Sequence, residues 1–422
     1  MISLPSWRST RRSDEIRPQV GLFGLLGLGN SGNEASVEAM LGYLRSARPD
    51  AAVDVMSAGA EHARAIFGLE VTPLAWYEKY QHNVIGPAGV FLRVIGKIID
   101  PIRIILWVRR HDLVIVPGMG VLEATTPLRA YGFPFSMFML SAAGRICGVK
   151  VALVSVGASK VKQRATRRLL NAAASMAAFR SYRDAYSVAA MRERGVDTSR
   201  DQVFPDLAFS LPVPAYNPGD TQLVAVGVMD FHGGNDDRAQ AAEIYAAYLG
   251  KMTEFVQWLL DAGFSVRLFG GDDSCDYAVA QEILTGVTPR AQEAGMGTAA
   301  EIAIVRPSSY SEMLGELNDV GMVVATRYHN VLGALLLCKP TVAVGYAQKF
   351  VSLMEAMGVT EFSQLAHQLD VTRLKEQFVE AQRCRAELRA ELMKRNAANA
   401  ESAAAQFALL TTVLFPPVKG SR

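Results

Sequence analysis

VVATRYHNVLGALLLCKPTVAVGYAQK, residues 323–349, contains an apolar strand, a helix and a second apolar strand in series. Arg327 and His329 fall where the first strand should give way to the helix. The second strand ends at Tyr346, with Lys349 just beyond it. Strand, helix and strand in this order form a parallel βαβ unit, and an open α/β sheet binds its ligands at the carboxyl ends of the strands. The stretch therefore predicts an α/β fold with a ligand site at one rim of the sheet.

The residue types at this rim suit a small anion. Arginine offers a planar fork to a carboxylate or phosphate, lysine a point charge, and histidine a proton near neutral pH. If the strand continues through them, Arg327 and His329 point the same way; if the helix has begun, they lie in its first turn, where the dipole favours an anion. Each residue alone is more typical of a surface charge or a structural histidine. Arg327, His329 and Lys349 at adjacent strand ends favour a binding site.

Apolar strands alternate with helical segments along the whole chain, which is typical of parallel sheets covered by helices. In the first half we expect strands at residues 20–26, 52–57, 113–117, 149–156, 178–181 and 203–204, and helices at 34–47, 134–148, 160–177 and 185–194. In the second half we expect strands at 223–228, 265–270, 302–305, 320–325 and 341–346, and a helix at 239–261. Each half of the chain is thus expected to form its own parallel sheet covered by helices.

The length of 422 residues exceeds one ordinary core. Residues 211–221 are rich in Pro, Gly and Asn, as linkers are. We predict two Rossmann-like domains, 19–212 and 222–422, facing each other across a cleft. Residues 1–18 should form a flexible basic arm, and the Ala-, Glu- and Arg-rich tail, 370–412, long helices that pack back on the first domain.

The amino-acid composition argues against several classes of protein. Half of the residues are hydrophobic, a fifth are charged and the net charge is +2, which argues against a disordered chain and a general nucleic-acid binder. No apolar core of a signal peptide and no uninterrupted membrane-spanning run is visible, so we expect a cytoplasmic protein.

The acidic and sulfur-containing residues do not indicate a metal site. The paired aspartates 236–237 and 272–273 lack further ligands, so we expect no metal. The cysteines match no zinc or CxxC spacing and are expected as reduced, mostly buried thiols: Cys147, Cys275, Cys338 and Cys384.

Residues 90–110, VFLRVIGKIIDPIRIILWVRR, are apolar but interrupted by charges. A basic amphipathic segment of this kind can lie in a membrane interface, which would place the protein at the inner face of the membrane. The alternative, slightly favoured, is a helix packed on the sheet and broken at Pro101.

Two glycine-rich loops follow expected strands. GLGNSG, residues 27–32, fits the GxGxxG pattern of nicotinamide-binding proteins, but the acid that should close the next strand is Asp54, which lies inside it. Backbone N–H groups at a helix start can still bind phosphate or carboxylate, so Asn30 and Gly32 are candidate ligand contacts. Gly118 follows another strand and suits a strained turn and a close ligand approach equally.

Three segments resemble signatures of the polysaccharide pyruvyl transferase family, in order and in separation. The residues concerned are Arg327 with His329, Tyr346 with Lys349, Ser181 with Arg183 and Asp184, Pro205 with Asp206, and the GLGNSGNEA loop. The resemblance spans residues 20–362 and implies a GT-B-like architecture. The chain departs from the family at Asn33, which stands where an aspartate is usual and cannot act as a base.

The resemblance implies transfer of the pyruvyl group of phosphoenolpyruvate to two hydroxyls of a sugar, forming a cyclic ketal without a cofactor. Arg183, Arg327 and Lys349 would bind the donor, Arg327 would stabilise the departing phosphate, and His329 would be the general acid. Asn30, Gly32, Gly118 and Tyr346 would complete the substrate site. The base is open: Asp184 is a candidate, but it equally suits an N-cap.

Two other functions remain. A GT-B glycosyltransferase that uses a nucleotide sugar would share the fold and the basic cleft, and a non-catalytic envelope-assembly protein would retain the fold without turnover. The acceptor is also open between a polysaccharide repeat, a lipid-linked sugar and a glycolipid.

Overall fold

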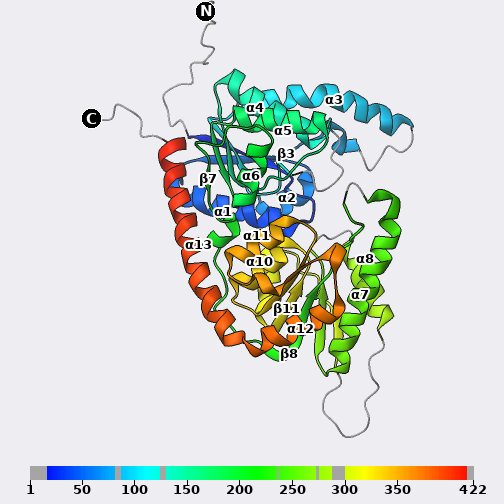
Figure 1. Ribbon diagram of the computed structural model, residues 1–422. Coiled ribbons are helices and arrows are strands. Elements are labelled where there is room, and N and C mark those ends of the chain that lie inside the picture. Colours follow the sequence, from blue (N-terminus) through cyan, green and yellow to red (C-terminus); the bar gives the residue numbers. More distant parts are fainter. Residues whose placement is uncertain are drawn as a thin grey trace, which may run out of the picture.

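The computed structural model describes residues 17–80, 87–123, 130–234, 237–271, 275–287 and 300–415. Two parallel sheets, each covered by helices, lie one above the other (Figure 1). We call the parts that contain them the first and the second domain. The α/β fold with two Rossmann-like halves is confirmed. The expected arm at residues 1–16, Asp236 and the aspartates 272–273 lie outside the described residues.

The first sheet has the strand order β3-β2-β1-β4-β5-β6-β7. Its strands are β1 (Gln19–Gly24), β2 (Ala52–Ser57), β3 (Val71–Pro73), β4 (Leu113–Pro117), β5 (Lys150–Val156), β6 (Phe179–Tyr182) and β7 (Gln202–Val203). Its helices are α1 (Ser31–Ala47), α2 (Ala60–Phe67), α3 (Pro87–Val108), α4 (Phe133–Cys147), α5 (Arg164–Met176) and α6 (Ala185–Glu193). The order reverses between β1 and β4, and such a switch point opens a ligand crevice at the strand ends.

The second sheet has the order β10-β9-β8-β11-β12-β13 and reverses between β8 and β11. Its strands are β8 (Asp220–Gly227), β9 (Ser265–Phe269), β10 (Ile302–Ile304), β11 (Val320–Ala325), β12 (Thr341–Gly345) and β13 (Ser363–Leu365). The helices of this half are α7 (Ala241–Asp261), α8 (Asp276–Gly286), α9 (Tyr310–Asn318), α10 (Tyr328–Leu336), α11 (Gln348–Ala356), α12 (Val371–Arg383) and α13 (Arg385–Leu414).

The central strands are buried along most of their length because helices cover both of their faces. Every residue of β4 and of β12 is buried. Helix α1 contacts α9 and α10 across the domain boundary, and α6 contacts α11. The carboxyl ends of the two sheets are thereby held opposite each other.

The last helix, α13, runs along both domains (Figure 1). Leu388 and Leu392 belong to the core of the second domain, whereas Leu410 and Leu414 belong to that of the first. The amide nitrogen of the fully buried Gln406 donates to the hydroxyls of Ser155 (2.9 Å) and Ser181 (2.8 Å) beneath the first sheet's strand ends. The helix therefore packs back on the first domain.

Two expectations from the sequence were wrong. Helix α3 continues through Pro101, because the burial of Ile104 and Trp107 in the first core outweighs the hydrogen bond that the proline removes. The cysteines are not mostly buried: Cys338 is, but Cys275 is exposed at the turn before α8, and the other two lie half-buried at helix ends. Within the described residues, no helix combines the length and the apolar character that crossing a bilayer requires.

Candidate functional site

A cavity of about 180 Å³ lies between the two domains, at the carboxyl ends of their strands. In the first domain its lining residues come from the segments after β1, β4 and β6. In the second domain they come from the segments after β9, β11 and β12. The lining residues are Leu25, Asn30, Ser31, Asn33, Met119, Gly120, Val121, Glu123, Arg183, Gly271, Arg327, Tyr328, His329, Asn330, Tyr346 and Lys349. Both topological switch points thus open into one space.

The structure brings six of the eight predicted site residues to this cavity: Asn30, Arg183, Arg327, His329, Tyr346 and Lys349. Gly32 is not part of the lining but packs against the ring of His329, which is. Gly118 is outside the lining; it has a φ of 55°, and its backbone packs against Ser36. The positive φ of Gly118 thus accounts for a glycine at this turn, and its contact with a ligand stays a prediction.

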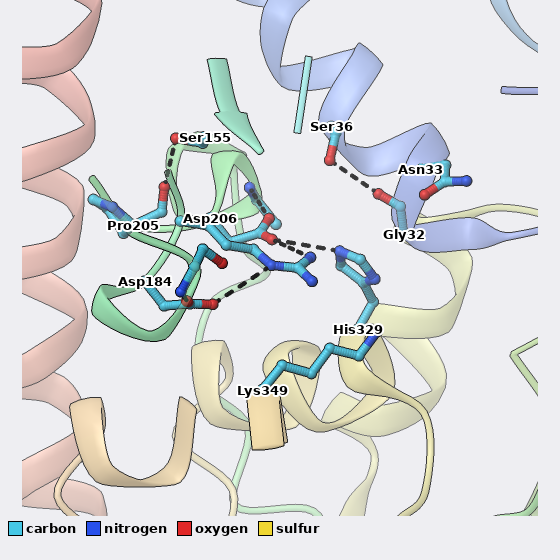
Figure 2. Close-up of polar contacts among 12 residues, drawn as sticks. Gly32, Asn33, Ser36, Ser155, Asp184, Pro205, Asp206, His329 and Lys349 are labelled. Atoms are coloured by element: carbon cyan, nitrogen blue, oxygen red, sulfur yellow. Dashed lines mark hydrogen bonds and ion pairs between the residues drawn. The ribbon is translucent and has the colours of Figure 1, made fainter. Parts of the chain in front are cut away.

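The imidazole of His329 is held between the domains (Figure 2). Its Nε2 lies 3.7 Å from Oδ2 of Asp206, an ion-pair distance rather than a hydrogen bond. On the other side, a Cβ at Gly32 would come within 1.7 Å of Nδ1, so only glycine fits at that position of α1. The side chain of His329 is 11% exposed. The ring is thus confined by one domain although it belongs to the other.

Asp206 is the charged partner behind this histidine. It precedes the short 3₁₀ helix Leu207–Ser210, and its carboxylate accepts from the N–H of Ala208 at 3.1 Å. Nη1 of Arg183 lies 3.6 Å from the same carboxylate. Burial alone would raise the pKa of Asp206, but His329 and Arg183 lower it to about 2. Asp206 is therefore ionised at neutral pH. The sequence had marked it only as part of a Pro-Asp motif, without a role.

A second buried carboxylate, Glu123, bridges Arg183 and Lys349, two of the cations that line the cavity. Arg183 Nη2 lies 2.5 Å from one of its oxygens and Lys349 Nζ lies 3.2 Å from the other. Although burial opposes the charge of Glu123, Lys349 and Arg183 hold its pKa below the usual value. Burial likewise opposes the charge of Lys349, and Glu123 raises its pKa. Both cations are thus charged and share one carboxylate.

Glycine loops make room for this bridge. A Cβ at Gly120 would lie 2.7 Å from the carboxyl carbon of Glu123, and one at Gly157 would lie 2.3 Å from its Oε1. The guanidinium of Arg183 stacks on the ring of Tyr328 at 4.5 Å. Sequence reasoning missed Glu123, and its signal was its place at the end of the glycine-rich loop VIVPGMGVLE.

Arg327 is tied to its own domain. Its guanidinium makes a fork on Asp276 at 2.8 and 2.6 Å, and Asp276 is fully buried at the start of α8. Arg327 is the N-cap of α10 and His329 lies in its first turn, so the helical alternative of the sequence analysis holds. The two residues face different carboxylates, which separates their roles.

Polar residues near the cavity are partly structural. Asn30 caps α1 by accepting from the N–H groups of Gly32 (3.2 Å) and Asn33 (3.3 Å), and Asn33 donates to the carbonyl of Leu25 at 2.8 Å.

Two acidic residues that the sequence left open also have structural roles. Asp184 caps α6 by accepting from the N–H group of Ser187 at 2.6 Å, which agrees with its interpretation as an N-cap. Asp54 accepts from Trp107 at 2.9 Å and lies 2.9 Å from a ring nitrogen of His111. Asp54 is thus part of the packing of α3, unlike the ribose-binding acid of a nicotinamide site.

Tyr346 closes the cavity at the end of β12. Burial would raise its pKa, but Lys349 and Arg327 lower it below the usual value. Nζ of Lys349 lies 5.1 Å from the centre of its ring. The phenol oxygen is therefore set in a positive field.

A smaller cavity of about 30 Å³ adjoins the first one and shares Ser31 and Gly271 with it. Glu34 and His62 of the first domain line it, and His62 Nε2 lies 3.5 Å from Glu34 Oε1. Although Glu34 follows Asn33 in α1, it lines this smaller cavity and not the first one. Over the described part of the chain, no group of three or more His, Cys, Asp or Glu side chains is placed to hold a metal ion.

The close approach of Gly32 to His329 predicts a sharp contrast between two glycines of α1. Gly32→Ala should lower the free energy of unfolding by about 1–3 kcal/mol, because the methyl group overpacks the domain boundary. Gly42→Ala is the matched control, since a Cβ there meets nothing within 4 Å. It should be neutral or slightly stabilising in the same urea titration. Equal stability of the two variants would show that the ring is not confined as described.

The ionisation of Asp206 predicts a pH-dependent stability. Because folding lowers its pKa, the carboxylate stabilises the fold above its unfolded-state pKa of about 4, and this contribution is lost as the pH falls towards about 2. Asp206→Asn should therefore be less stable than the wild type at neutral pH, and the difference should shrink between about pH 4 and pH 2. Denaturant titrations at several pH values measure it, and a difference that does not change with pH would contradict the assignment.

Comparisons with known proteins agree with this architecture. The family model described as polysaccharide pyruvyl transferase matches residues 30–348. A crystal structure of a putative UDP-N-acetylglucosamine 2-epimerase from Listeria monocytogenes has a TM-score of 0.59 at 13% identity, covering 96% of this chain and 98% of that one. The UDP-GlcNAc 2-epimerase from Neisseria meningitidis gives 0.56 at 10% identity, covering 94% and 99%. A glycosyltransferase from Rickettsia africae gives 0.54 at 10%, covering 95% and 100%.

At these identities the solved structures establish the fold alone, which is that of GT-B enzymes. The comparison with curated proteins returned no match. The family model covers most of the chain, including the start of α1, the Arg183 segment and the Arg327–His329 step that build the cavity. The chain belongs to the polysaccharide pyruvyl transferase family.

Proposed function

We propose that the protein transfers the pyruvyl group of phosphoenolpyruvate to two hydroxyls of a sugar in a polysaccharide or glycolipid precursor, forming a cyclic ketal without a cofactor. One observation carries the proposal: His329 shares the cavity wall with the buried Arg183 and the 13% exposed Lys349, two cations joined by one carboxylate. This set matches a donor that presents a phosphate and a carboxylate and must receive a proton on carbon.

The cavity is built to accept an anion. Arg183 and Lys349 are already desolvated and oriented, and an incoming phosphate or carboxylate competes with Glu123 for them. The first turns of α1 and α10 also open into this space, through Ser31 and His329. The dipoles of these two helices add to the attraction for negative charge.

The proton transfer falls to His329. It would protonate the methylene carbon of phosphoenolpyruvate, which leaves an oxocarbenium-like centre at the neighbouring carbon. A sugar hydroxyl attacks that carbon and loses its proton; the second hydroxyl then closes the ring as the carbon–oxygen bond to phosphate breaks, and its proton leaves with the phosphate. Asp206, ionised and 3.7 Å away, is the negative partner that a proton-donating imidazole requires.

For the acceptor hydroxyl we assign the proton acceptor to Glu34, paired with His62 in the adjoining cavity. Asp184 is committed as the cap of α6, and Asn33 cannot accept a proton. Arg327, fixed on Asp276, would hold the departing phosphate at the opposite wall. Tyr346, with its lowered pKa, would orient the donor beside Lys349.

The role of His329 gives a kinetic prediction. His329→Ala should lower kcat by ~10²–10⁴-fold, the usual contribution of a general acid, while phosphoenolpyruvate still binds. Phosphate release in the presence of acceptor measures the first effect and calorimetry measures the second. His367→Ala, an exposed histidine of the second domain, is the control and should leave both unchanged. Wild-type turnover by His329→Ala would remove it from the mechanism.

Thermal unfolding with phosphoenolpyruvate, UDP and GDP added separately tests the function itself. A ligand at a hundredfold over its Kd stabilises the fold by ~2.7 kcal/mol, which is a clear shift. The proposal requires a shift with phosphoenolpyruvate that Lys349→Met abolishes. A shift with a nucleotide alone would favour the nucleotide-sugar glycosyltransferase, and binding of phosphoenolpyruvate without any product would favour a non-catalytic envelope-assembly protein.

A further inference from the structure

Helix α3 is apolar on two opposite faces, although it lies at the surface. One face, with Ile104, Trp107 and Val108, is buried in the core of the first domain. The other exposes five large apolar side chains at helical spacing: Phe91, Val94, Ile98, Ile102 and Leu106. Ile98 is 70% and Phe91 65% exposed. A helix that is apolar all round is normally buried on all sides, so a partner is missing from this face.

The surroundings of this face are strongly basic. Helices α3, α4 and α5 pack side by side on the side of the first sheet that faces away from the second domain (Figure 1). Asp100 is the only acidic residue in the sequences of these three helices, and it is buried, with its carboxylate bound to the N–H of Trp76 and to Arg103. Exposed cations lie on the same layer and at its edges: Lys97, Arg109, Arg110, Arg145, Arg164 and Arg168.

We propose that α3 docks the protein on an anionic lipid bilayer, with the helix in the plane of the interface. The five apolar side chains would enter the boundary between headgroups and acyl chains, and the flanking cations would meet the negative headgroups. A second copy of the chain fits less well, because two such basic surfaces would repel each other. The described helices do not span a bilayer, so the contact is peripheral.

This inference does not depend on pyruvyl transfer. The α3 face shares no residue with the lining of the interdomain cavity, so lipid binding and donor binding can succeed or fail separately. If both hold, the acceptor class narrows to sugars carried on membrane lipids, since a docked enzyme meets those first.

Vesicle flotation tests the surface. The whole chain should float with vesicles of phosphatidylcholine and phosphatidylglycerol, bind pure phosphatidylcholine far less, and come off as salt is raised. Ile98→Gln/Ile102→Gln should weaken the partition by at least about tenfold, because both side chains then lose their burial in the interface. These residues are solvent-exposed, so the fold and phosphoenolpyruvate binding should be unchanged.

Val379→Gln/Met393→Gln is the matched control. These side chains are 53% and 54% exposed on α12 and α13, away from the α3 face, so this variant should float like the wild type. Failure of the wild type to float with anionic vesicles would overturn the proposal, as would equal flotation of the Ile98→Gln/Ile102→Gln variant. A dimer that this variant dissociates, without vesicle binding, would assign the face to a second copy and overturn it as well.

Discussion

Two buried carboxylates hold the site together, and each lies against a basic side chain of the second domain. Glu123 bridges to Lys349, and Asp206 faces His329. Charges buried this deeply are tolerated only when they are paired, because an unpaired buried charge costs several kcal/mol. The relative position of the two domains is therefore linked to the charge balance of the cavity.

This linkage has a consequence for ligand binding. Arg183 stands between the two carboxylates, in contact with Glu123 and 3.6 Å from Asp206, and all three are almost fully buried. An anion that takes Lys349 from Glu123 breaks a contact between domains and replaces it with a contact to itself. Binding energy at the cavity would thus be coupled to domain movement, with α13 keeping both halves attached. The fit of His329 against Gly32 keeps the imidazole in one place.

The sequence alone predicts the features that depend on local pattern. Fully buried strands such as β4 and β12 follow from hydropathy, and the strand-to-helix step at Arg327 and His329 follows from residue type. The three-residue strand β3 is too short to show a periodicity, and the continuation of α3 through Pro101 depends on tertiary packing that outweighs a local rule. Glu123 and Asp206 become site residues only through partners 226 and 123 positions away (Lys349 and His329), which no local pattern reveals. The sequence shows the glycine-rich loop that contains Glu123 and the Pro-Asp step that contains Asp206. It does not show which charged side chains they pair with.

A crystal structure with bound phosphoenolpyruvate would show directly which side chains hold the donor and its reacting carbon. We expect the ligand in the interdomain cavity, with its phosphate and carboxylate bound by Arg183, Arg327 and Lys349. At least one of Arg183 and Lys349 should have moved away from Glu123. The methylene carbon should lie within about 3.5 Å of a ring nitrogen of His329, the reach of a near-attack geometry. A ligand bound elsewhere, or bound with its methylene turned away from His329, would show that His329 is not the proton donor in this cavity.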